Sequence, residues 1–206
     1  FDSSIMDIKK IANTLLIFII NRLIEIAGIL ISIFGILIFI SLISYSPNDP
    51  NFIFPKNIEI ENLLGFHGSY LSDLFFQSIG LIAYLVPVTY FLTGINIFSR
   101  KEFLLFISST FFIITYSLTG SIFFSFFYEY NFILHINGNG GFVGNYLNES
   151  LLENLIKTYK NFFYYFLILL TTTLFLLSIN FNLKKFISFI KKIISKFFFK
   201  KNKNYT

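Results

Sequence analysis

The chain has 206 residues, of which 55% are hydrophobic and only 13% are charged, and its formal net charge is +5. Soluble domains carry about 25% charged residues, so this composition excludes an ordinary soluble domain and indicates a membrane protein. The absence of cysteine excludes a disulfide framework, thiol catalysis and cysteine-based metal sites.

The first segment, residues 1–22, is predicted as a cytoplasmic lead-in to the first membrane span. Lys9 and Lys10 precede the apolar run IANTLLIFII, as they would in a signal peptide. The run ends in Asn21 and Arg22 without a small-residue cleavage pattern, which favours the lead-in. Because the chain opens with phenylalanine rather than methionine, we expect it to be part of a longer protein.

Four apolar runs without a charged residue follow the lead-in. They cover residues 26–45, 74–98, 103–127 and 162–179. A helix needs about 20 residues to cross a hydrocarbon core of about 30 Å, so each run is long enough to form a span. The predicted fold class is therefore all-α: a polytopic membrane protein with four transmembrane helices, forming an anchor over residues 23–183.

The positive charges of the chain are distributed unevenly between its connecting segments. Lys9, Lys10 and Arg22 precede the first span, Arg100 and Lys101 separate the second from the third, and eight lysines follow the fourth. The two longer loops carry few lysines and several glutamates. Because cytoplasmic segments are enriched in Lys and Arg, this pattern predicts both termini in the cytoplasm and the two longer loops outside.

The first outer loop begins with SYSPNDPNF. Pro47 and Pro50 cannot extend a helix, and Asn48 and Asp49 favour turns by bonding to nearby backbone. The stretch GFHGSYLSD then returns the chain to the membrane, and its glycines either turn the chain or belong to a contact surface. Its last residue, Asp73, is predicted as the helix cap that opens the second span.

The second outer loop contains NGNGGFVG, which predicts a tight turn or a re-entrant bend. It lacks the GxxxxGK[ST] spacing of a nucleotide-binding loop. The following stretch, NESLLENLIKTY, has apolar residues at helical spacing and predicts a short surface helix. The chain has two histidines, His67 and His135, which fall in different loops and are expected to be solvated rather than to bind a metal.

The tail, residues 184–206, is predicted as a lysine-rich cytoplasmic segment beside the membrane that begins a linker. Its lysines are Lys184, Lys185, Lys191, Lys192, Lys196, Lys200, Lys201 and Lys203. Lysines interleaved with bulky apolar residues favour binding to anionic lipid at about 1 kcal/mol per charge. DNA phosphates would attract the same lysines, and a stop-transfer signal needs no partner at all.

The loop motifs, taken in order, resemble the membrane anchor of FtsK/SpoIIIE-type DNA translocases. A helix exit of the SYSPNDP type is followed by G-x-x-G-x-x-L-x-D, by the helix opening FFQSIGLIAYLVPV and, in the second outer loop, by GGFVGNYL. The residues that carry the resemblance are Pro47, Asp49, Pro50, Gly65, Gly68, Leu71, Asp73, Phe75, Phe76, Gly80, Ala83, Tyr84 and Pro87, with Gly140, Gly141 and Gly144 in the second loop.

In that family, a four-helix anchor holds a hexameric cytoplasmic ATPase at the division septum. The resemblance therefore implies an inner-membrane anchor that acts in cell division and chromosome segregation, and that contacts lipid, division proteins and further copies of itself. The family's ATP, Mg²⁺ and DNA sites belong to the motor, and no catalytic, cofactor or metal site is predicted in this chain. Either a motor follows residue 206 or the chain is a stand-alone anchor.

A small transporter or channel subunit is the alternative function. Transporters place ionisable residues inside the membrane, where they handle ions or substrates. The four predicted spans contain none, which favours the anchor.

Overall fold

The computed structural model describes residues 2–50, 59–128, 134, 137–148, 153–181, 188, 191, 192 and 195, and this part of the chain is helical without strands. Its elements are α1 (Asp2–Ile43), α2 (Gly65–Ile79), the 3₁₀ helix η1 (Gly80–Tyr84), α3 (Leu85–Arg100), α4 (Leu104–Phe127), α5 (Gly141–Leu147), α6 (Glu153–Thr158) and α7 (Lys160–Ser178).

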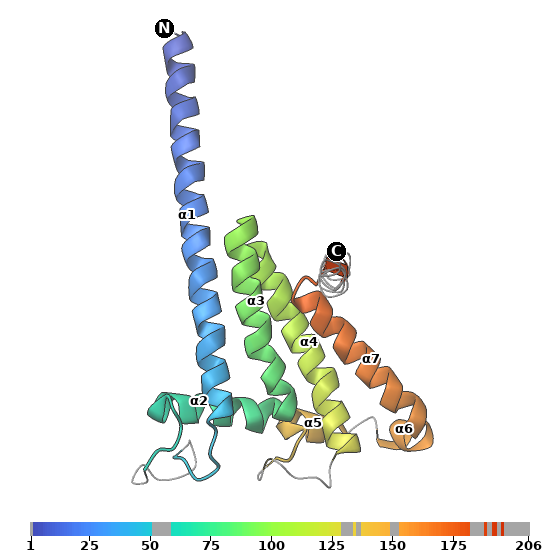
Figure 1. The fold of residues 1–206 in the computed structure, drawn as a ribbon. Helices are drawn as coiled ribbons and strands as arrows, with labels where there is room; N and C mark the ends of the chain where they lie inside the picture. Colours follow the sequence, from blue (N-terminus) through green and yellow to red (C-terminus); the bar gives the residue numbers. More distant parts are fainter. Residues whose placement is uncertain are drawn as a thin grey trace, which may run out of the picture.

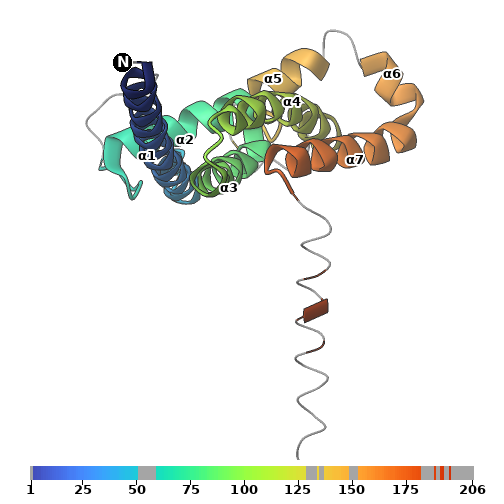
Figure 2. The same ribbon diagram turned by 90° about the horizontal axis from the view of Figure 1, so that it is seen from above.

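The long helices form a row in which α1 packs on α3, α3 on α4, and α4 on α7 (Figures 1 and 2). Four helical segments are long and apolar enough to cross a membrane, which confirms the predicted fold class. The turn between α3 and α4 marks one end of the row, which we call the basic end because it holds Arg22, Arg100 and Lys101. The opposite end, which we call the loop end, carries α2 and α5 (Figure 1).

Helix α1 is much longer than the predicted first span. It has 42 residues, which corresponds to about 63 Å of helix. The predicted span at 26–45 is its C-terminal half, and the helix ends at Ile43. The predicted lead-in belongs to the same continuous helix and projects past the end of α3 (Figure 1).

The second span differs from its prediction as one straight helix over 74–98. Helix α2 instead lies across the loop end, and η1 leads from it into α3 (Figure 1). Gly80, with φ 69°, ends α2. Pro87 lies in the first turn of α3, where a missing backbone N–H costs no hydrogen bond.

The prediction that Asp73 caps the second span is therefore wrong. Helix α2 begins at Gly65, so Asp73 lies in its middle, where its side chain is buried. No charged residue separates the apolar residues of α2 from those of α3, so the sequence pattern predicted a single span that begins after Asp73.

The third and fourth spans agree with their predictions to within two residues at either end, as α4 and α7. The short surface helix predicted after the second loop is α6, in which Lys157 pairs with Glu153 one turn before it. Buried apolar residues join neighbouring elements: Ile38, Leu42, Phe76, Ala83 and Leu134; Ile82, Val86, Ile113 and Tyr116; Ile122, Ile156 and Leu167.

Candidate functional site at the loop end

The first outer loop is closed by a pair of buried polar residues, Asp49 and Asn62. The Asp49 carboxylate accepts hydrogen bonds from the backbone N–H groups of Glu61, at 2.8 Å, and Asn62, at 3.0 Å. The Asn62 side-chain amide donates to the carbonyl oxygens of Ser41, at 2.9 Å, and Ser44, at 3.1 Å. Asp49 and Asn62 are only 3% and 4% exposed, so the pair ties the residues before α2 to the end of α1.

Gly68 of α2 fits against this pair. A Cβ at Gly68 would lie 2.1 Å from Oδ1 of Asn62, and the hydrogen bonds of Asn62 prevent its amide from moving away. The carbonyl oxygen of Gly68 accepts a hydrogen bond of 2.6 Å from Ser41. Gly68 is therefore needed for close packing inside the chain, a role that the sequence did not predict.

Replacing Asp49 by alanine is expected to lower the free energy of unfolding by about 1–3 kcal/mol, because the backbone N–H groups of Glu61 and Asn62 lose a charged acceptor. Thermal and denaturant unfolding of the purified protein in detergent measures the loss. Asn48→Ala is the matched control, since Asn48 is the exposed neighbour in the same turn. Equal stability of the two variants would contradict the role of Asp49.

A half-buried tyrosine packs against α2. The ring of Tyr45 packs edge-on against Phe76, with 4.9 Å between centroids. Burial first, and the charge of the nearby Asp73 carboxylate second, raise the pKa of Tyr45 to about 12. The Tyr45 hydroxyl therefore stays protonated through the physiological range. The Asp73 carboxylate accepts a hydrogen bond of 3.3 Å from the side-chain amide of Gln77, one turn further along α2.

The motifs of the two outer loops meet at Gly80. The backbone N–H of Leu81 donates to the carbonyl oxygen of Asn139 at 2.9 Å, and a Cβ at Gly80 would lie 2.0 Å from that oxygen. A Cβ at Gly141, which has φ 65°, would lie 2.6 Å from the backbone nitrogen of Gly80 and 2.7 Å from that of Ile79. The tight turn predicted for NGNGGFVG is confirmed, and it fits directly against the break between α2 and α3.

Two further glycines of the second loop lie against α4. A Cβ at Gly140 would lie 2.5 Å from Cβ of Ser125, and one at Gly144 would lie 2.4 Å from the carbonyl oxygen of Ser121. Asn145 holds the loop in place, because it accepts a hydrogen bond of 2.7 Å from Ser125 and its amide donates to the carbonyl oxygen of residue 137. The loop end is thus one continuous layer built from both outer loops.

Sequence reasoning missed the asparagines of this layer, Asn62, Asn139 and Asn145. Each lies near a motif glycine, and asparagine beside glycine is typical of turns, so composition offered a weak signal. The remaining motif residues are distributed through the layer. Pro50 and Ala83 are buried, Leu71 is half-buried, and Pro47 and Tyr84 are exposed.

The histidines and the tail lysines are described only in part. His67 is exposed on α2, as the sequence predicts, and Lys191 and Lys192 are exposed. His135 lies outside the described residues, as do Lys184, Lys185, Lys196, Lys200, Lys201 and Lys203.

Hydrogen bonds between buried hydroxyl groups join α3, α4 and α7. The hydroxyl of Thr89 lies 3.1 Å from those of Tyr116 and Ser178. Ser109 accepts a hydrogen bond of 2.8 Å from Thr93 and donates one of 2.7 Å to the carbonyl oxygen of Ser178. In a membrane such bonds hold helices together, and here they attach the end of α7 to the rest of the row.

Ser109→Ala is expected to lower the free energy of unfolding by roughly 1 kcal/mol, because two interhelical hydrogen bonds worth about 0.6 kcal/mol each are lost. Unfolding in mixed detergent micelles measures the difference. Ser108→Ala, an exposed neighbour on the same helix, should leave stability unchanged. A neutral Ser109→Ala variant would show that these bonds do not hold α7.

The contact between α1 and α3 depends on glycine and serine. A Cβ at Gly28 would lie 2.8 Å from the carbonyl oxygen of Gly94, and Ser32 donates a hydrogen bond of 3.2 Å to the carbonyl oxygen of Phe91. Toward the basic end, Glu25 pairs with both Arg22 and Lys101. The small residues allow the two backbones to approach closely, and the ion pair between Glu25 and Lys101 joins α1 to the end of α3.

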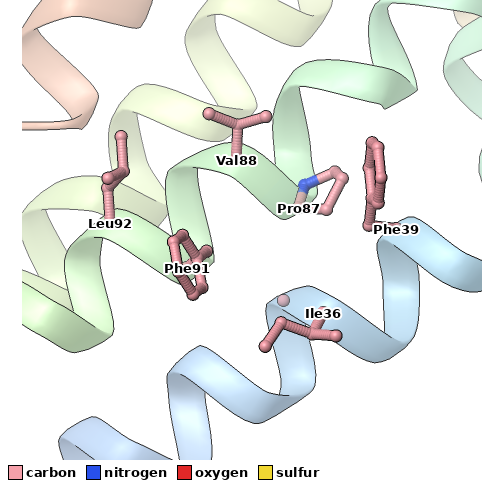
Figure 3. A pocket seen from close by; sticks show the side chains of 7 residues that line it. Ile36, Phe39, Pro87, Val88, Phe91 and Leu92 are labelled. Atoms are coloured by element: carbon pink, nitrogen blue, oxygen red, sulfur yellow. The ribbon is translucent and has the colours of Figure 1, made fainter.

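An apolar crevice of about 340 Å³ lies between α1 and α3, where Ile36 and Phe39 of α1 face Pro87 and Phe91 of α3 (Figure 3). Its lining residues are Gly35, Ile36, Phe39, Pro87, Val88, Phe91 and Leu92. None of these side chains is polar, so the crevice offers nothing to bind an ion or a polar solute.

These features define a class: a multi-pass helical membrane protein whose two outer loops form one packed layer. The chain matches, over residues 21–191, the family described as the 4TM region of DNA translocase FtsK/SpoIIIE, and it belongs to that family. The resemblance predicted from the loop motifs is therefore confirmed.

Individual relatives agree with this assignment. The chain is similar to the DNA translocase FtsK of Rickettsia bellii, with 34% identity over 77 residues, which are 37% of this chain and 10% of the relative. The corresponding protein of Rickettsia typhi is 32% identical over 90 residues, covering 42% and 12%. That of Azospirillum brasilense is 33% identical over 87 residues, covering 41% and 14%.

The matched part is thus between a tenth and a seventh of the length of these relatives. No solved structure matches the chain.

Proposed function

We propose that the chain is the membrane anchor of a septal DNA translocase that acts in cell division and chromosome segregation in the bacterial inner membrane. The observation that carries this proposal is the family match over residues 21–191, supported by the meeting of both family loop motifs at Gly80. The anchor holds the motor in place, while the motor moves DNA.

The anchor itself is proposed to be non-catalytic. The sequence contains no GxxxxGK[ST] nucleotide loop, and its predicted spans carry no charged residue. ATP, Mg²⁺ and DNA are accordingly assigned to the motor of the complete protein, which these residues do not include.

The two ends of the anchor have different proposed partners. With the basic end in the cytoplasm, exposed Lys191 and Lys192 face the anionic inner surface of the membrane. The loop end then faces outward and offers a stacked ring pair, Phe142 and Tyr146, each 62% exposed with 6.0 Å between centroids. Exposed aromatic side chains are enriched where proteins bind one another, so this pair is the proposed contact for division proteins.

A fluorescent fusion of residues 1–206 in dividing cells tests the proposal. We expect septal enrichment of the unchanged chain and its loss in the double variant Phe142→Ala with Tyr146→Ala, with membrane insertion retained. Tyr165→Ala, an exposed tyrosine of α7, is the matched control and should keep the enrichment. A uniform membrane signal from the unchanged chain would contradict a septal role.

A further inference from the structure

The apolar crevice between α1 and α3 opens to the outside of the chain. Three of its large lining residues stay partly exposed: Ile36 and Phe39 at 45% each, and Phe91 at 38%. The space between them is about 340 Å³ (Figure 3). An apolar cavity of about 150 Å³ already holds a benzene ring, so the crevice has room for part of a hydrocarbon chain. Because both helices cross the membrane, this opening faces the hydrocarbon of the bilayer.

The crevice lies at the depth where the acyl chains of one leaflet end. Arg22 and Ile43 are separated by about 32 Å of helix, close to the core thickness of about 30 Å, so Arg22 marks the edge of the core at the basic end. The crevice begins at Leu92, about 14 Å along α3 from Lys101. One leaflet contributes about 15 Å of the core, so an acyl chain that starts at the basic end reaches the crevice.

Two cations at the basic end share one carboxylate. Glu25, whose side chain is 13% exposed, pairs with Arg22 and Lys101, whose side chains are 54% and 40% exposed. Arg100 and Glu102 flank Lys101 and are exposed, so three cations and two carboxylates leave a charge of +1 here. The excess positive charge is carried by exposed side chains at the level of the lipid headgroups, where it attracts anionic lipid.

The cations and the crevice lie on one side of the contact between α1 and α3. At about 100° per residue, Glu25 and Ile29 are each within about 20° of Ile36 around α1. Ile29, which is 47% exposed, and Ile95 of α3, which is 44% exposed, continue the apolar surface from the crevice toward the basic end. One lipid molecule can therefore contact the cations and the crevice at the same time.

The leaflet at the loop end offers no comparable charge near the crevice. Among the residues that the structure describes, the lysines toward the loop end are Lys157 and Lys160, in α6 and at the start of α7. Both helices stand at the other end of the row from α1 (Figure 2). A lipid that entered from the loop end would therefore find no cation for its headgroup.

We propose that the crevice holds one acyl chain of an anionic phospholipid from the leaflet at the basic end, whose headgroup phosphate is bound by Arg22 and Lys101. The lipid fills the gap between α1 and α3 and belongs to the folded anchor. This inference depends neither on a septal location nor on the lysines of the tail.

A photoactivatable phosphatidylglycerol tests where the acyl chain lies. It carries the reactive group at the end of one acyl chain and is diluted into phosphatidylcholine vesicles that contain the full chain. Mass spectrometry is expected to find several times more label on Phe39 and Leu92 than on Ile114. Ile114 is the matched control, because it is 59% exposed and lies about 15 Å along α4 from the basic end. Equal labelling would show that only bulk lipid touches the crevice and would overturn the proposal.

Arg22→Gln tests the headgroup site, because the pair of Arg22 with Glu25 lies within α1 and its loss breaks no contact between helices. Labelling of the crevice is expected to fall about fivefold, the share that one cation near a membrane surface contributes. Arg100→Gln removes the same charge from the same end, but Arg100 is turned by about 180° around α3 from Phe91, and labelling should be unchanged. Equal loss in both variants, or no loss in either, would overturn the proposal.

Competition between lipids tests the charge of the headgroup. Added unlabelled phosphatidylglycerol is expected to displace the label from the crevice, whereas the same amount of added phosphatidylcholine is expected to leave it in place. Equal displacement by the two lipids would contradict a site for anionic phospholipid.

Discussion

Replacing Gly94 by leucine is expected to separate α1 from α3. A Cβ at Gly94 would lie 2.2 Å from Oγ of Ser32 and 2.4 Å from the carbonyl oxygen of Gly28. The second contact is with backbone, so it cannot be relieved by a change of side-chain rotamer. Overpacking a core typically costs about 1–3 kcal/mol, and we expect the upper end of that range or more because a whole helix must move.

Denaturant unfolding in detergent measures the loss of stability at Gly94, and cross-linking between cysteines at positions 32 and 91 reports whether α1 stays in place. Ile95→Leu, a change of equal volume at an exposed neighbour, is the control and should preserve both properties. If Gly94→Leu keeps the cross-link at full yield, then the two helices do not approach as closely as described.

Gly80→Val is expected to detach the second outer loop from the end of α2. Gly80 has φ 69° and ψ −148°, a region that only glycine adopts without strain. Its Cβ would also lie 2.0 Å from the carbonyl oxygen of Asn139, which would break the hydrogen bond from Leu81. Strain and overpacking together are expected to cost about 3 kcal/mol or more.

Thermal unfolding and protease sensitivity of the second loop measure the effect at Gly80. Gly65→Ala is the matched control, because Gly65 has a similar φ of 62° but nothing within 4 Å of a Cβ. The control therefore carries the backbone strain without the collision. Similar losses in the two variants would mean that contact between the loops contributes little.

Both of these large expected losses of stability arise at glycines, Gly94 and Gly80, whose close contacts the sequence alone did not reveal. The motifs GFHGSYLSD and GGFVG lie more than sixty residues apart in the chain. The first motif begins α2, and α2 ends at Gly80, where the backbone meets Asn139, Gly140 and Gly141 of the second loop. Mutations at the end of α2 are therefore expected to affect the second loop, and mutations at these loop residues are expected to affect the end of α2.

The sequence by itself determined that the chain has four membrane spans, because uncharged apolar runs of this length are typical of helices that cross the hydrocarbon core. It also determined the ends of α4 and α7, where charged or turn-forming residues stop the apolar run within one or two residues. The family followed from the order of the loop motifs.

Only the tertiary structure decided how α2 lies, what Asp73 does and how far α1 extends. A helix that crosses the membrane and a helix that lies across the loop end can have the same apolar composition. The hydropathy pattern therefore predicted the end of α2 and the whole of α3 as one span. The break at Gly80 is stabilised by Asn139, a residue close in space and distant in the chain. A contact between residues so far apart in the chain leaves no periodic pattern in the sequence, so only the folded structure reveals it.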